Sequence, residues 1–314
     1  MISTIVGALL PIVVTLLLGF AAGWHHDFDA KQATVLNRMV MLYALPLSLF
    51  GSMIGSSRDG ILAEGPLALI ILVGMAGAYA VVFVVCRMLL RNDLATAGLR
   101  AIAISGPAVP FVGTSVLGQL FGAESAVPIS VSGLAMNLIQ VPATLMLLSA
   151  AQSGADTTRN APPPTVWHHV VHALREPVVW APLLAFVLVL ANLHFPAPVR
   201  QSLLLLGSAT GGVALFASGI VLHAQNVAVN FPVILSVVSR NIAIPAIMWA
   251  ALLALGVAGP AMKEGVITLA IPTASICVIL AVQYHTAEQE MASMLFFSTI
   301  FSVVTMGGFI WLTA

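Results

Sequence analysis

Two membrane-length apolar segments of this chain, 99–121 and 263–284, are interrupted near their middle by proline. Pro107 and Pro110 stand in the first segment and Pro272 stands in the second. Proline lacks a backbone donor and stops a helix from continuing, so each break frees amide and carbonyl groups at a depth that water does not reach. Non-helical backbone survives there only where protein buries it or where it lines a polar cavity. The paired breaks therefore predict a solute site inside the membrane, as in a transporter.

The composition supports a chain that crosses a membrane many times. Of its 314 residues, 60% are hydrophobic and 7% are charged, whereas a soluble domain carries about 25% charged residues. Ten apolar segments follow one another, most of them near the ~20 residues that cross the hydrocarbon layer. We predict spans at 3–23, 33–54, 66–86, 99–121, 126–150, 177–193, 202–222, 231–256, 263–284 and 291–312. The predicted fold class is an all-α integral membrane protein with ten transmembrane helices.

Lysine and arginine set the expected orientation, because cytoplasmic loops are enriched in them. With the N-terminus outside, the inner loops and their flanks would hold Lys31, Arg38, Arg87, Arg91, Arg100, Arg159 and Arg175. The outer ones would hold Arg58, Arg200 and Lys263, while Arg240 falls inside a span. We therefore expect both termini outside.

A polar, proline-rich stretch at 151–176 divides the chain. We predict that it is a cytoplasmic linker between a first five-helix repeat at 1–150 and a second at 177–314. Because each half holds an odd number of spans, the halves would be inverted repeats, a symmetry found in many secondary transporters.

Two sequence matches support the repeat. Segments 46–54 and 212–220 agree at four positions, namely Leu49/Leu215, Phe50/Phe216, Ser52/Ser218 and Ile54/Ile220. Pro110 falls on Pro272 at nearly the same offset. Their agreement in order and spacing predicts that the broken spans are the fourth and the ninth, one in each repeat.

The half-helices that follow the breaks predict an anion site. Each begins with unpaired N–H groups and with the positive end of a helix dipole, so two of them converging at mid-membrane would bind an anion without a charged side chain. Hydroxyl groups of Ser105, Thr273 and Ser275, together with Thr114 and Ser115, could add hydrogen bonds to a carboxylate. The alternative is a pair of ordinary proline kinks, healed by hydroxyl side chains or water. The repetition of the break in both halves favours the site.

Three further polar residues in spans are candidates. Arg240 lies roughly 14 Å into the eighth span by helical rise. It would be either the counter-ion of an anionic solute or a structural group that caps carbonyls where a broken helix ends. Asn137 and Gln140 in the fifth span are either polar contacts between helices or residues that line the cavity.

All eleven acidic residues fall in loops or at span ends, which argues against a carboxylate proton relay and against a sodium cage built on glutamate. The coupling ion therefore stays open.

Enzymatic and metal-binding functions find little support. The chain lacks the serine-hydrolase elbow, the His-Glu-X-X-His motif and the phosphate-binding Gly-X4-Gly-Lys-Ser/Thr motif. His168 and His172 have a spacing compatible with a metal, but histidines at a wet membrane interface are the favoured interpretation. We predict no cofactor, no metal and no nucleic-acid partner.

The chain resembles the auxin efflux carrier family over essentially its whole length. The resemblance rests on Asn37 with Ala44-Leu-Pro46, on Leu120-Phe-Gly122, on Ala270-Ile-Pro272-Thr-Ala and on Ala281-Val-Gln-Tyr284. The family's fourth-span pattern, roughly Asn-X-X-Phe-X-Gly-X-Pro, matches this chain at Phe111 and Gly113. Ala108 replaces the asparagine and Ser115 the proline. These positions join the candidate site, but the details of substrate contact do not transfer.

The resemblance implies a fold like that of bile acid/sodium symporters, with crossed broken helices. Spans one, two, six and seven would form a scaffold, the other six a moving domain, and the scaffold would form a homodimer in the lipid bilayer. The short linker is similar to that of compact bacterial members, which are associated with malonate and similar acids. We expect a secondary transporter of the bacterial inner membrane, with periplasmic termini, that moves a small organic anion by an elevator type of alternating access. The alternatives are an anion channel and a non-transporting membrane sensor.

Overall fold

The computed structural model describes residues 2–55, 58, 65–155, 175, 177–193, 195–225, 227 and 229–313. Most of the predicted linker, including His168 and His172, lies outside the described residues. The described chain is helical, and its strand-like element is one isolated antiparallel bridge between Pro107 and Thr273.

In the first half the elements are α1 (Ile2–Trp24), α2 (Ala30–Met39), η1 (Val40–Ala44), α3 (Leu45–Met53), α5 (Gly65–Val84), η2 (Val85–Leu89), α6 (Leu94–Ser105), η3 (Val109–Gly113), α7 (Thr114–Phe121), η4 (Gly122–Ser125), α8 (Ala126–Ala135), η5 (Met136–Gln140) and α9 (Val141–Ala155). In the second half they are α11 (Pro177–Leu190), α12 (Ala197–Gly207), α13 (Ala209–Gln225), α14 (Phe231–Val238), η6 (Ser239–Ala243), α15 (Ile244–Ala254), α16 (Pro260–Ala270), α17 (Ile276–Gln283) and α18 (Glu288–Leu312). All η elements except η4, a 3₁₀ turn, are short π-helical turns that continue the helices beside them.

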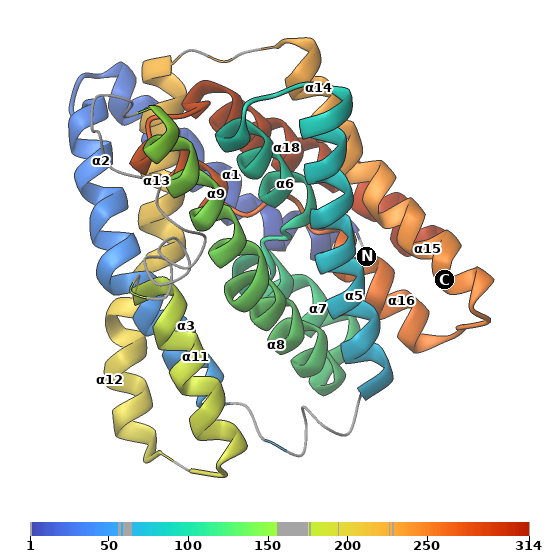
Figure 1. The fold of residues 1–314 in the computed structure, drawn as a ribbon. Coiled ribbons are helices and arrows are strands. Elements are labelled where there is room, and N and C mark those ends of the chain that lie inside the picture. The colour runs from blue at the N-terminus through green and yellow to red at the C-terminus, as the bar shows by residue number, and fades with distance from the viewer. Residues whose placement is uncertain are drawn as a thin grey trace.

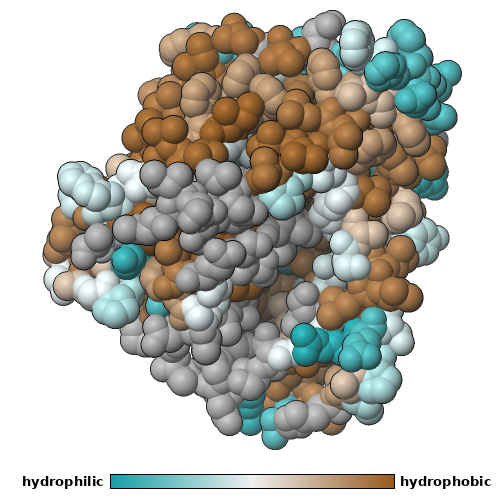
Figure 2. All heavy atoms as spheres, turned by 180° about the vertical axis from the view of Figure 1, so that it is seen from behind, coloured by the Kyte–Doolittle hydropathy of each residue, from teal (hydrophilic) through white to brown (hydrophobic). Residues whose placement is uncertain are grey.

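Six helical stretches of the described chain are long and apolar enough to cross a membrane. They are Ala30–Gly51, Leu67–Leu89, Val131–Gln152, Ala197–Ala224, Phe231–Ala254 and Glu288–Leu312. Shorter apolar helices, Val13–Trp24, Leu94–Ser105 and Val179–Leu190, cover parts of the first, fourth and sixth predicted spans. The all-α membrane architecture is confirmed, while the ten-span count and the inverted repeat stay predictions. Hydrophobic side chains also cover most of the non-grey surface in Figure 2, and hydrophilic ones gather near its margins.

The helices pack as two groups (Figure 1). In the first group α1 lies along α13, α2 also contacts α13, and α3 packs against α11 and α12. In the second group α5 contacts α6 and α8, α6 contacts α9, and α18 contacts α14 and α16. The groups meet where α1 and α13 contact α18 and where α2 contacts α17.

Glycine permits the close packing of α1 against α13. A Cβ atom added at Gly19 would overlap the carbonyl oxygen of Phe216, and one added at Gly219 would overlap that of Leu16. Small residues let membrane helices approach until their backbones touch, which provides packing that hydrophobicity cannot supply between helices in lipid. The first group is thus held by an interface that no larger side chain would fit.

Helix α6 has a defined start and an early end. The carboxylate of Asp93 accepts the backbone N–H of Thr96 at 2.9 Å and so caps the first turn. Partial burial opposes ionisation of Asp93, but the hydrogen bonds with Thr96 outweigh it and lower the pKa of the carboxyl group below its usual value. The helix begins at Leu94 rather than at the predicted residue 99, and it ends at Ser105.

Both predicted breaks are present. Helix α6 ends at Ser105 before helical turns resume at Val109, and α16 ends at Ala270 before α17 begins at Ile276. Pro107 and Pro272 therefore each stand two residues beyond the last helical residue. Pro110 instead falls inside the π-helical turn η3. The alignment of Pro110 with Pro272 is thus wrong by one turn, and Pro107 is the counterpart.

Candidate functional site

The backbones of the two breaks cross and bind each other. Pro107 and Thr273 form the antiparallel bridge. The N–H of Ala108 donates to the carbonyl oxygen of Pro272 at 2.9 Å, and the N–H of Ala274 donates to that of Gly106 at 3.1 Å. Each break therefore satisfies polar groups that the other has freed, which resolves the cost of leaving a helix inside a membrane.

The guanidinium of Arg240, a residue of η6, joins the two breaks. The side chain is 0% exposed. Its Nη1 donates to the carbonyl oxygen of Ile104 at 3.1 Å, in the last turn of α6, and its Nη2 donates to that of Ile271, directly after α16. These are the carbonyl-capping contacts of the structural alternative. Arg240 forms no ion pair among the described residues, so its buried positive charge favours an anion nearby.

The second break has a further layer of polar support. The Thr273 hydroxyl donates to the carbonyl oxygen of Ala103 in α6 at 2.6 Å. The Thr273 N–H donates to the Ser298 hydroxyl at 3.2 Å, which in turn donates to Asn241 Oδ1 at 2.6 Å. Asn241 Nδ2 returns a hydrogen bond to the Ser298 carbonyl oxygen at 2.8 Å. The break thus receives a fixed hydrogen-bond network from η6 and α18.

The first break is held by an amide of η5. Gln140 Nε2 donates to the Ser105 hydroxyl at 3.1 Å and to the carbonyl oxygen of Met75 in α5 at 3.0 Å. The Ser105 hydroxyl donates within its own helix, to Ala101, at 2.6 Å. Gly106 is required here, because an added Cβ atom would lie 2.6 Å from the Ile102 carbonyl oxygen.

A cavity of about 30 Å³ lies beside the crossing, between the two helical groups. Its lining residues are Leu45, Leu49 and Thr210 from the first group, with Ala108, Met136, Asn137, Ala274, Ser275, Ile276 and Ile279 from the second. Thr210 is 1% exposed, and its hydroxyl has no hydrogen-bond partner among the described residues. The start of α17 faces this space, so the positive end of its dipole does too. The volume suits about one water molecule, so a solute would require the groups to separate.

The structure places the predicted site residues differently relative to the cavity and the crossing. Ala108, Ser275 and Asn137 line the cavity, although Asn137 Nδ2 also donates to the Gly133 carbonyl oxygen at 2.7 Å. Pro107, Pro272, Thr273, Ser105 and Arg240 build the crossing, and the described contacts engage their polar groups within the protein, except for Arg240 Nε, which has no hydrogen-bond partner among the described residues. Gly113 packs near the other break, since an added Cβ atom would lie 3.2 Å from Ile271 Cδ1. The side chains of Pro110, Phe111, Thr114 and Ser115 lie outside the described residues.

Sequence reasoning missed Thr210 and the Asn241–Ser298 pair, whereas Gln140 does form the predicted polar contact between helices. Thr210 stood in an apolar span beside several serines, so nothing in the sequence distinguished its hydroxyl from theirs. The pairing of Asn241 with Ser298 joins residues 57 positions apart, and no local pattern predicts it.

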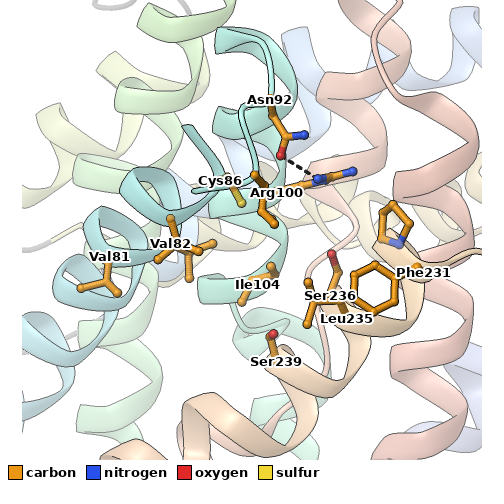
Figure 3. A pocket seen from close by; sticks show the side chains of 13 residues that line it. Val81, Val82, Cys86, Asn92, Arg100, Ile104, Phe231, Leu235, Ser236 and Ser239 are labelled. Carbon is orange, nitrogen blue, oxygen red and sulfur yellow. Dashed lines mark hydrogen bonds between the residues drawn. The ribbon is translucent and has the colours of Figure 1, made fainter. Parts of the chain in front are cut away.

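A larger cavity of about 320 Å³ lies within the second group, where α6 faces α5 and α14. Figure 3 shows Arg100 reaching toward Asn92, to whose Oδ1 its Nη1 donates at 2.7 Å. Nη2 of Arg100 also donates to Glu290 Oε2 at 2.8 Å. The guanidinium is therefore already neutralised, and this cavity offers an anion less than the crossing does.

A third cavity, of about 360 Å³, lies between α2 and α17. Thr34, Asn37 and Arg38 line it from α2, and Ile279, Val282 and Gln283 line it from α17. Ile279 also lines the cavity beside the crossing, so the two spaces share a wall.

Comparison with known proteins gives one family and several relatives. A family model described as "Membrane transport protein" matches residues 4–310. A protein named "Uncharacterized transporter YfdV" from Escherichia coli (strain K12) is 30% identical over 307 residues, which are 97% of this chain and 96% of the relative. A protein named "Putative malonate transporter" from Rhizobium meliloti (strain 1021) is 21% identical over 313 residues, or 99% of this chain and 96% of the relative. Both names describe transporters.

Proposed function

We propose that this chain, which belongs to the membrane transport protein family and so to the auxin efflux carriers, moves a small organic anion across the membrane by alternating access. The observation that carries the proposal is the cavity beside two crossed helix breaks, with an unneutralised arginine holding both breaks. A relative named for malonate supports a carboxylate or dicarboxylate as the solute class.

The chemistry of the cavity suits a carboxylate. Thr210 and Ser275 bring hydroxyl groups, and α17 brings the positive end of its dipole. Arg240 does not line the cavity, but its charge is buried among low-dielectric surroundings, where electrostatic attraction at a given distance is stronger than in water. The site would thus prefer anions although no charged side chain forms a salt bridge with the solute.

The cavity size supports movement between the two helical groups. At about 30 Å³ it is far below the ~300–1,000 Å³ of typical small-molecule sites. The first group would act as the scaffold and the second as the moving domain, with an elevator displacement that opens the cavity to each side in turn. We infer the ten-span inverted repeat and the outside termini that the sequence predicts, and the scaffold homodimer that the resemblance implies.

Flux into proteoliposomes tests the proposal. Purified protein should take up labelled malonate with saturation, and unlabelled carboxylate inside the vesicles should accelerate uptake by counterflow. Flux that does not saturate and shows no counterflow would indicate a channel instead. Binding without flux would indicate a sensor. A broad panel of carboxylates that crosses no faster than in empty vesicles would refute transport of this class.

Two substitutions locate the solute. Thr210→Val and Ser275→Ala should each raise the KM for malonate by about three- to tenfold, because each removes one hydrogen bond to the anion. Thr15→Val is the matched control, since that hydroxyl is exposed and donates within its own helix to Pro11. Equal KM values in all three variants would place the solute elsewhere.

A further inference from the structure

The cavity between α2 and α17 contains a buried amide with no partner. Asn37 is 2% exposed, and neither its Nδ2 nor its Oδ1 has a hydrogen-bond partner among the described residues. By contrast, Asn241 is bound through both of its side-chain polar atoms. Because a buried polar group without a partner is costly, such a group points to a ligand that completes it.

The position of this cavity connects it to the crossing. Asn37 and Arg38 belong to the first helical group, whereas Ile279 and Gln283 belong to the second. Ile279 is shared with the small cavity, and Ser275 and Gln283 are separated along α17 by roughly 12 Å of helical rise. With about 360 Å³, the cavity has the size of a small-molecule site. The α2–α17 cavity therefore extends along α17 away from the crossing, and it has room for a solute.

The lining groups restrict the chemistry of that ligand. Arg38 brings a positive charge that no carboxylate pairs with among the described residues, so an anion is favoured. The amide of Asn37 offers both a donor and an acceptor, and both are unsatisfied in either orientation of the amide. A simple carboxylate would satisfy the donor alone. A ligand that satisfies both carries an O–H group beside its carboxylate.

We propose that the α2–α17 cavity is a second binding site, at which Asn37 and Arg38 hold a carboxylate that also bears a hydroxyl group, namely a hydroxy acid. The inference rests on the proposed function, since it places this site on the solute's route to the crossing. Asn37 is then the residue that selects among organic acids of similar size, and Arg38 supplies the attraction.

The test compares malonate with tartronate, which differs from it by one hydroxyl group. Equilibrium binding of both labelled acids is measured on purified protein in phosphatidylcholine nanodiscs. The wild type should bind tartronate about tenfold more tightly than malonate, the gain expected from one buried hydrogen bond. Asn37→Leu, which replaces the amide by an apolar side chain of similar size, should abolish that preference. Arg38→Gln should weaken the binding of both acids.

Arg87→Gln is the matched control, because Arg87 is an exposed cation that donates to the Asn92 carbonyl oxygen and does not line this cavity. It should leave both affinities unchanged. Equal binding of the two acids by the wild type, or an unchanged preference in Asn37→Leu, would overturn the inference. An effect of Asn37→Leu and Arg38→Gln confined to nanodiscs containing phosphatidylglycerol would also overturn it, since the occupant would then be a lipid headgroup.

Counterflow measured on the same variants separates this inference from the proposed function. Saturable flux that is insensitive to Asn37 and to the hydroxyl group would leave transport standing and refute the second site. Tartronate binding that depends on Asn37, without flux of any carboxylate, would support the site and refute transport.

Discussion

The two breaks share a backbone design but differ in their side-chain support. Helix α6 ends at Ser105 and α16 ends at Ala270, each with a proline two residues later. The hydrogen bonds from Ala108 to Pro272 and from Ala274 to Gly106 are reciprocal. The first break, however, relies on the single amide of Gln140, whereas the second has the Asn241–Ser298 network.

Arg240 makes the difference larger, because it comes from the second half alone and binds a carbonyl oxygen at each break. The backbone is thus arranged alike at the two breaks, but the positive charge that binds both of them comes from the second half alone. The comparison teaches that the backbone pairing creates the crossing, while side chains of the second half determine its electrostatic potential and much of its rigidity. Substitutions at one break should therefore affect that break, and substitutions of Arg240 should affect both.

The largest effect is expected from Arg240→Gln. Loss of the guanidinium leaves buried carbonyl oxygens at both breaks without donors and should destabilise the protein by roughly 3–5 kcal/mol. The apparent Tm should fall, and the KM for malonate should rise at least tenfold because the positive charge is lost. Thermal unfolding and proteoliposome uptake measure the two effects.

Arg240→Lys separates charge from hydrogen bonding. Lysine keeps the positive charge but cannot present two forked donors to the carbonyl oxygens of Ile104 and Ile271. We expect a lower Tm with a KM close to that of the wild type. A KM that is equal in both variants would show that the charge of Arg240 does not attract the anion.

The next effect tests the first break alone. Gly106→Ala places a methyl group 2.6 Å from the Ile102 carbonyl oxygen and 3.2 Å from Gln140 Oε1, and such overpacking costs about 1–3 kcal/mol. The Tm should fall, and the initial rate of uptake should fall with it because the crossing is displaced. Gly133→Ala in α8 is the control, since nothing lies within 4 Å of an added Cβ atom there. Similar losses in both variants would mean that the crossing is not tightly packed.

A smaller effect is expected from two substitutions that compare the side-chain supports of the two breaks. Asn241→Leu removes two hydrogen bonds with Ser298 and should cost about 1–3 kcal/mol. Gln140→Leu should cost less, because it also removes the buried Oε1, which has no partner among the described residues. The difference in Tm between the two variants measures how unequal the supports are. A larger loss from Gln140→Leu would reverse the comparison.

The arrangement of the breaks could be predicted from the sequence because proline acts locally. Pro107 and Pro272 lack a backbone donor and stand just beyond the ends of α6 and α16, so the breaks could be predicted from the chain, as could the helical membrane architecture. Which proline stands at the first break did not follow from the sequence. Pro110 is tolerated inside η3, a π-helical turn, and nothing in the sequence announces such turns.

The site was only partly predictable, because the sequence does not show which of its polar groups already have partners within the protein. Ser105 and Thr273 were expected to bind a solute, yet their hydroxyls donate to Ala101 and Ala103. Ser275 does line the cavity, and so does Thr210, which comes from α13 in the first helical group. Which hydroxyls remain available depends on tertiary contacts, and a hydrophobic pattern carries no information about those.

The smallest expected effect distinguishes a hydroxyl that binds within its own helix from one that spans the crossing. Ser105→Ala removes a bond to Ala101, four residues earlier, and one acceptor for Gln140, and should change stability by about 0.5 kcal/mol. Thr273→Val keeps the side-chain shape but removes the bond from the second break to Ala103 in α6, and should cost about 1–2 kcal/mol. The bond from Thr273 to Ala103 holds the second break against α6. Thr273→Val should therefore also speed amide hydrogen exchange at Ala108 and Ala274, whereas Ser105→Ala should leave that exchange unchanged. Equal exchange rates in the two variants would show that the backbone pairing holds the crossing by itself, and the side-chain differences between the breaks would then affect charge alone.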